Sequence, residues 1–130
     1  MKTTILVVDD SDDNRDILKE YLEESGFAVI ESSDGVEALE KLKKRSDNIS
    51  IVITDIRMPR MDGKELIKNI RKEYKTIGII AITLYPSIYH EDDYRKLGAD
   101  DYIVKPFEFD DIILKIEKLL FQIDNLQTKK

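Results

Sequence analysis

Short apolar segments rich in Ile and Val alternate along this chain with longer segments in which apolar residues recur every three or four positions. The first pattern is typical of buried strands and the second of amphipathic helices. We expect five strands, all of them buried, at residues 5–8, 27–30, 51–54, 79–83 and 102–104. Because parallel strands need crossover connections, usually helices, the alternation predicts an α/β protein with a doubly wound, five-stranded parallel sheet.

Four of the five expected helices have a clear apolar stripe, and the fourth, at about residues 87–97, has a mixed face. Residues typical of helix ends support the same layout. Gly26 and Gly98 stand where the first and fourth helices should end, and Asp34 and Asp110 where the second and fifth should begin. We therefore expect one domain over residues 1–123, followed by a short polar tail at residues 124–130.

Composition argues against several kinds of function. There are 27 acidic and 21 basic residues, a net charge of −6, and no basic run long enough to follow a nucleic-acid backbone, so direct nucleic-acid binding is not expected. The chain has no Cys, which removes disulfides, thiolate catalysis and Cys-ligated zinc and suits a cytoplasmic protein. No apolar segment is long enough to span a membrane.

Polar residues follow or end four of the five expected strands. Asp9 and Asp10 follow the first, Asp55 follows the third, Thr83 ends the fourth and Lys105 follows the fifth, whereas the second contributes nothing comparable. Each residue taken singly has an ordinary explanation as a turn, cap or surface residue. Because the carboxyl ends of parallel strands form the ligand-binding edge of such sheets, their joint placement predicts a functional site.

Three aspartates at one site repel one another unless one takes up a proton or a divalent cation lies among them. Two or three protein oxygens with room for water suit Mg²⁺, with Mn²⁺ as a surrogate. Asp55 stands alone at its strand end and is the candidate to attack phosphorus while also facing the cation. Asp10 is then the direct ligand and Asp9 a ligand through water, and the main-chain carbonyl of Arg57 could add an oxygen.

Phosphoryl transfer needs mainly positioning and stabilisation of charge on the equatorial oxygens. The cation, the Lys105 ammonium and the Thr83 hydroxyl would share that task.

Five segments together resemble the receiver domains of two-component response regulators, and the likeness covers nearly the whole chain. They are ILVVDD at residues 5–10, DIRMPRMDG at 55–63, IT at 82–83, GADDY at 98–102 and KPF at 105–107. The resemblance implies a flavodoxin-like (βα)₅ fold of strand order 2-1-3-4-5. It also implies a phosphorelay switch rather than a multiple-turnover enzyme, with a histidine kinase or a His-containing phosphotransfer protein as the donor.

The resemblance assigns roles to the site residues. Asp55 would accept the phosphoryl group, Asp9 and Asp10 would be the Mg²⁺ pair, and Lys105 would contact the phosphoryl group. Thr83 and Tyr102 would form a switch pair. Their movement would repack the face made by the fourth helix, fifth strand and fifth helix, which a downstream protein target reads.

Partner contacts are also implied. The donor would dock around a set of residues on the first helix and after the fifth strand: Asn14, Ile17, Leu18, Pro106 and Phe107. The peptide between Lys105 and Pro106 is expected to be cis. The chain would be a monomer or a weak homodimer.

The sequence departs from the usual receiver pattern at two positions and has two large residues beside the site. Leu84 follows Thr83 where a small residue is usual, and Tyr94 stands where the fourth helix usually has Ala. Arg57 and Tyr85 flank the site and could tune the lifetime of the phosphorylated state in either direction.

Three other functions compete with the switch. An aspartate-nucleophile phosphohydrolase would use similar residues, but its paired-aspartate signature is absent. A phosphorylation-independent binding module is suggested only by Leu84. A flavodoxin is disfavoured because no Ser/Thr/Gly-rich loop follows the first strand.

Overall fold

The computed structural model describes residues 2–45, 48–58, 60–83 and 91–128. Its strands are β1 (Thr4–Val8), β2 (Ala28–Ser32), β3 (Ile49–Asp55), β4 (Gly78–Thr83) and β5 (Asp101–Val104). They pair in parallel in the order β2-β1-β3-β4-β5. The helices are α1 (Asp12–Glu24), α2 (Gly35–Arg45), α3 (Gly63–Glu73), α4 (Glu91–Leu97) and α5 (Phe109–Thr128). The predicted α/β class and the strand order implied by the resemblance are both confirmed.

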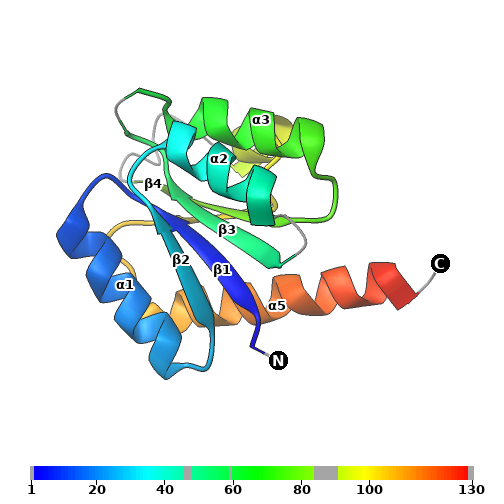
Figure 1. The fold of residues 1–130 in the computed structure, drawn as a ribbon. Coiled ribbons are helices and arrows are strands. Elements are labelled where there is room, and N and C mark those ends of the chain that lie inside the picture. The colour runs from blue at the N-terminus through cyan, green and yellow to red at the C-terminus, as the bar shows by residue number, and fades with distance from the viewer. Residues whose placement is uncertain (1, 46–47, 59, 84–90, 129–130) are drawn as a thin grey trace.

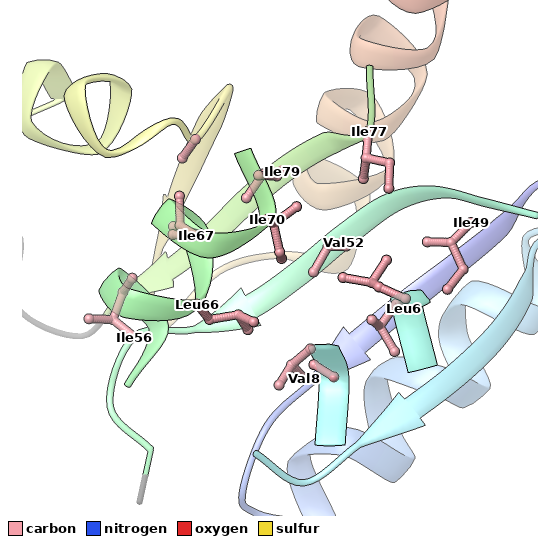
Figure 2. Close-up of a cluster of buried hydrophobic side chains, with 14 of the residues drawn as sticks. Leu6, Val8, Ile49, Val52, Ile56, Leu66, Ile67, Ile70, Ile77 and Ile79 are labelled. Atoms are coloured by element: carbon pink, nitrogen blue, oxygen red, sulfur yellow. The ribbon is translucent and has the colours of Figure 1, made fainter. Parts of the chain in front are cut away.

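Helices cover both faces of the sheet, with α2 and α3 on one face and α1 and α5 on the other (Figure 1). Successive residues of a strand point to opposite faces, so Leu6 and Val8 join one buried cluster and Ile5 and Val7 the other. Figure 2 shows the first cluster, in which side chains of β1, β3 and β4 meet those of α3. The apolar sequences of the inner strands follow from this burial on two sides.

The expectation that all five strands are buried is wrong for the two outer ones. In β2 only Ser32 is fully buried, and in β5 only Ile103 is, whereas every residue of β4 is buried. The reason is the strand order, because β2 and β5 each have a strand neighbour on one side only.

Helix ends follow the sequence signals closely. Gly26 and Gly98 have φ angles of 99° and 115°, which residues with a Cβ rarely adopt, and they end α1 and α4. The side chain of Asp34 accepts a hydrogen bond from the Glu37 N–H at 2.8 Å and caps α2. Asp110 lies in the first turn of α5.

Two helices differ from what the sequence suggested. The expected first residues of α4, at 87–90, lie outside the described part of the chain, and its mixed face does carry a fully buried residue, Tyr94. Helix α5 continues to Thr128 and so includes most of the segment expected as a polar tail. Its apolar stripe also continues, since Leu119 and Ile123 pack over Gly78 at the start of β4. Within the described ranges, no helix is long and apolar enough to cross a membrane.

Candidate functional site

The acidic residues after β1 and at the end of β3 lie together. Carboxylate oxygens of Asp9, Asp10 and Asp55 are all within 4.8 Å of one another. The pairing of β1 with β3 explains this, because Val8 lies opposite Thr54 and the next residues on the two strands are Asp9 and Asp55. Asp9 is buried, Asp55 is partly buried and Asp10 is exposed, so the cluster opens to solvent on one side.

The fourth and fifth strands complete the same edge of the sheet. The Lys105 ammonium lies 3.2 Å from Oδ2 of Asp55, and the Lys105 main-chain N–H donates to the Thr83 carbonyl at 2.8 Å. Thr83 is buried, with 4% of its surface exposed. It follows Ile82, the register partner of Asp55, so the strand pairing brings Thr83 to this edge too. The structure therefore gathers here all five residues that the sequence places at strand ends.

Local backbone packing fixes Asp55. Its Oδ1 accepts a hydrogen bond from the Ile56 N–H at 2.8 Å, and the Gly63 N–H donates to the Ile56 carbonyl at 2.7 Å. A Cβ on Gly63 would lie 2.3 Å from the Asp55 carbonyl oxygen, so only glycine allows the start of α3 to pack this closely. Asp55 is thus held by the helix that follows it.

The electrostatics of the cluster favour a cation. Burial raises the pKa of the Asp9 carboxyl above its ordinary value of 3.8, and the charges of Asp55 and Asp10 raise it further. The Ser11 N–H, which donates to Asp9 Oδ1 at 2.9 Å, and the Lys105 ammonium act in the opposite direction. Three carboxylate oxygens this close form a hard-oxygen donor set that fits a small divalent ion.

The expected switch aromatic packs against α4. The ring of Tyr102 on β5 stacks on the ring of Tyr94, with centroids 5.1 Å apart and an angle of 18° between the planes. Tyr94 is almost fully buried, at 1% exposure, and Tyr102 is partly buried. The large residue at position 94 therefore fills space between α4 and the sheet.

The residues expected to contact a donor protein line one groove of about 380 Å³. It also reaches the acidic edge, since its lining consists of Asp9, Asn14, Ile17, Leu18, Ile82, Lys105, Pro106, Phe107 and Phe109. Ile17 is 52% exposed, which is unusual for a large apolar side chain, whereas Leu18 is buried. The Lys105–Pro106 peptide is cis, as the resemblance implied.

Leu84 and Tyr85, which the sequence places beside the site, lie outside the described residues. Arg57 is exposed on the loop that follows Asp55.

Sequence reasoning missed two arginines that hold loops of the site. Arg60, with a φ of 67°, pairs with the α2 cap Asp34 at 2.9 Å and fastens the loop between Asp55 and α3. Arg15 on α1 donates to the Asp9 carbonyl at 2.6 Å. No spacing signal marks the first pair, because Asp34 and Arg60 are far apart in sequence. The only signal for Arg15 is its place on the first helix turn after the acidic residues.

The sequence model of the response regulator receiver domain matches residues 5–117. The transcriptional regulatory protein SrrA of Staphylococcus aureus is 38% identical over 120 residues, which are 92% of this chain and 48% of that protein. The chain thus spans about half the length of the curated relatives it matches.

Solved structures with the same fold include further proteins of this kind. A receiver domain protein from Clostridium thermocellum superposes with a TM-score of 0.90 at 27% identity, covering 95% of this chain and 98% of that one. The chemotaxis response regulator CheY4 of Vibrio cholerae superposes with a TM-score of 0.81 at 30% identity, covering 92% and 99% of the two chains.

Proposed function

The chain belongs to the response regulator receiver family, and on that premise we propose that it is a signalling switch phosphorylated on Asp55. The donor would be a histidine of a kinase or of a phosphotransfer protein. The observation that carries this proposal is the setting of the Asp55 carboxylate, which has two further carboxylates within 4.8 Å and a lysine ammonium 3.2 Å away.

Mg²⁺, with Mn²⁺ as its surrogate, would be held by Asp9, Asp10, Asp55 and the main-chain carbonyl of Arg57. The hard-oxygen donor set within 4.8 Å supports this choice. When bound, the ion supplies positive charge that offsets the repulsion among the carboxylates and the incoming phosphoryl oxygens.

The residues of the chain then position the Asp55 carboxylate and neutralise charge on the phosphoryl oxygens. A carboxylate oxygen of Asp55 forms a bond to phosphorus while the bond from phosphorus to the donor imidazole nitrogen breaks, and the electron pair of that bond stays on the imidazole. The Ile56 N–H keeps the carboxylate from turning, through its bond to Oδ1. The Lys105 ammonium pairs with a phosphoryl oxygen, and the Thr83 hydroxyl donates to another.

The change would be read on the face made by α4, β5 and α5. Thr83 ends β4, and the neighbouring strand β5 carries Tyr102, whose ring stacks on Tyr94 of α4. Movement of Thr83 toward the phosphoryl group would alter the space beside Tyr102 and repack this face. A downstream protein target would bind the repacked face, and the donor protein would use the groove around Ile17 and Phe107.

The test is phosphorylation by a small donor such as phosphoramidate with Mg²⁺, followed by the mass of the intact protein. The wild type should gain one phosphoryl group and Asp55→Asn none. Asp13→Asn, at an exposed position in the first turn of α1, is the matched control and should behave as wild type. Labelling that survives in Asp55→Asn would rule Asp55 out, and linear release of phosphate from phosphate esters would indicate a hydrolase instead.

A further inference from the structure

We propose that Arg15 is a positioning residue for the acidic site: from α1 it fixes the peptide between Asp9 and Asp10 and thereby the directions of both carboxylates. The inference rests on the proposed metal-assisted function. Arg15 itself touches no carboxylate of the cluster, so its effect would pass through the main chain.

The contacts of the Arg15 guanidinium form a fork. Nη1 donates to the Asp9 carbonyl at 2.6 Å, Nε donates to Glu31 at 3.3 Å, and Nη2 donates to Asp12 at 2.5 Å. Only 13% of the side chain is exposed. A planar guanidinium held by two carboxylates has little freedom to turn, so its third contact sets where the Asp9 carbonyl points.

The Asp9 main chain is held on its other side as well. Its N–H donates to the Ser32 carbonyl of β2 at 3.1 Å. The N–H belongs to the peptide between Val8 and Asp9 and the carbonyl to the peptide between Asp9 and Asp10, so β2 and Arg15 together fix the orientation of the two peptide planes that meet at the Asp9 Cα. That orientation determines how the neighbouring side chains leave the backbone.

Glu31 gives the second strand a part in the site that sequence reasoning did not find. Its two carboxylate oxygens accept from Arg15 and from Lys19, each at 3.3 Å, and its main-chain carbonyl accepts from Lys41. The carboxylate is thus held from α1 and the backbone from α2. Through Arg15, β2 stabilises a loop that it does not itself form.

Positioning and simple charge predict opposite results, which makes the inference testable. Arg15 carries a positive charge near a cation site, so by electrostatics alone its removal should strengthen Mg²⁺ binding. If Arg15 instead orients the ligands, its removal should weaken binding, as loss of the partners that orient metal ligands commonly does.

The experiment is calorimetric titration of the full chain with MgCl₂ at constant ionic strength. Arg15→Gln should raise the Kd for Mg²⁺ about tenfold. Arg15→Lys keeps the charge but loses the fork and should also bind more weakly. Lys19→Gln is the matched control, because it removes a positive charge that touches Glu31 but not Asp9, and its Kd should stay within about twofold of wild type.

Two further readouts separate positioning from a general loss of structure. Amide resonances of residues 9–11 in the metal-free protein should broaden or shift in Arg15→Gln, while those of α5 stay unchanged. The loss in phosphorylation rate should shrink as Mg²⁺ is raised. If Arg15→Gln does not fold, Glu31→Gln, which removes the Oε1 charge that holds Nε, should still raise the Kd, by about threefold.

The outcomes are distinct. If the wild type does not bind Mg²⁺, the metal part of the proposed function fails and this inference fails with it. If the wild type binds and Arg15→Gln binds equally well or more tightly, only the role of Arg15 is overturned.

Discussion

Charged side chains are compensated by opposite charge or hydrogen bonds at one end of the sheet, whereas like charges lie close together at the other end. At the amino ends of β4 and β5, the Arg71 guanidinium donates to four main-chain carbonyls, those of Gly98, Tyr74, Lys75 and Ile77, and to the carboxylate of Asp100 at 2.8 Å. The same Asp100 oxygen accepts from the Ile79 N–H at 2.8 Å. At the carboxyl ends, three carboxylates face one ammonium.

The difference separates structural charge from functional charge. At the amino ends Arg71 and Asp100 each meet opposite charge or dipoles, and their contacts tie α3, α4 and two strands together. At the carboxyl ends like charges remain close, and one of them, Asp9, is buried. Such an arrangement lowers stability by itself and is expected where a cation or a phosphoryl group is bound.

The largest loss of stability is expected at Gly63, where the start of α3 packs against the backbone of Asp55 and Ile56. Gly63→Ala would place a Cβ 2.3 Å from the Asp55 carbonyl oxygen and 2.6 Å from the Ile56 Cα, both backbone atoms that cannot move independently. We expect a loss of about 3 kcal/mol in the free energy of unfolding and a large fall in phosphorylation. Urea denaturation measures the first. Gly26→Ala, where nothing lies within 4 Å of the added Cβ, tests positive φ without a clash and should lose less.

The second-largest loss of stability is expected for Arg71→Leu. It removes the Arg71 donor from four main-chain carbonyl oxygens and from the Asp100 carboxylate, which keeps the Ile79 N–H, and we expect a loss of about 2 kcal/mol in the free energy of unfolding. Phosphorylation per folded molecule should be unchanged, because the acidic site lies at the other end of the sheet. Denaturation and phosphorylation measured on the same preparation check both statements. Equal losses of stability and phosphorylation in folded protein would contradict the separation of the two ends.

Replacing Asp by Asn at each end of the sheet gives the clearest contrast between the two ends. Asp100→Asn removes a charge that Arg71 and the Ile79 N–H stabilise, and it should lower the free energy of unfolding by about 1.5 kcal/mol. Thermal and urea denaturation without divalent ions provide the measurement. A gain in stability here would mean that the amino-end network is not compensated as described.

Asp9→Asn, at the carboxyl ends of the strands, should instead raise the free energy of unfolding. In metal-free protein at pH 7 it removes a buried charge beside Asp55 and Asp10, and the amide can still accept from the Ser11 N–H. We expect a gain in the free energy of unfolding, together with a marked loss of Mg²⁺ affinity. A destabilised Asp9→Asn protein would show that repulsion at this end is weaker than its geometry indicates.

The smallest effect is a pH dependence of that gain. Because the pKa of Asp9 is raised in the folded state, the folded chain takes up this proton at a higher pH than the unfolded chain does. The contribution of Asp9 to stability therefore rises as the pH falls through its folded pKa toward 3.8. The advantage of Asp9→Asn over wild type should shrink over that range. Denaturation of both proteins in parallel, without metal, isolates the difference.

Much of the fold was predictable because it is encoded locally. Apolar runs and helical stripes predict the strands and helices within a few residues, and Gly26 and Gly98 indicate helix ends by their conformational freedom. What local patterns lack is the lateral order of strands, which came from the family resemblance. The same limit explains why β2 and β5 were expected to be buried like the inner strands.

The site divides in the same way. Strand-end residues such as Asp55 and Lys105 could be proposed from sequence because parallel strands share an edge. The pairs that orient them could not, because Arg15 with Glu31 and Arg60 with Asp34 join elements whose separation depends on helix placement. Tyr94 gave a mixed helical pattern, although its ring is packed against Tyr102.

Because α5 is long, a small tilt at its first turn moves its far end by a larger distance. The helix begins shortly after Lys105, runs for 20 residues and extends past the amino ends of the strands (Figure 1). At 1.5 Å per residue its span is about 30 Å, so a tilt of about 5° at its first turn carries its far end about 2.6 Å. A displacement too small to disturb the packing around Lys105 would therefore be magnified at the opposite pole of the protein.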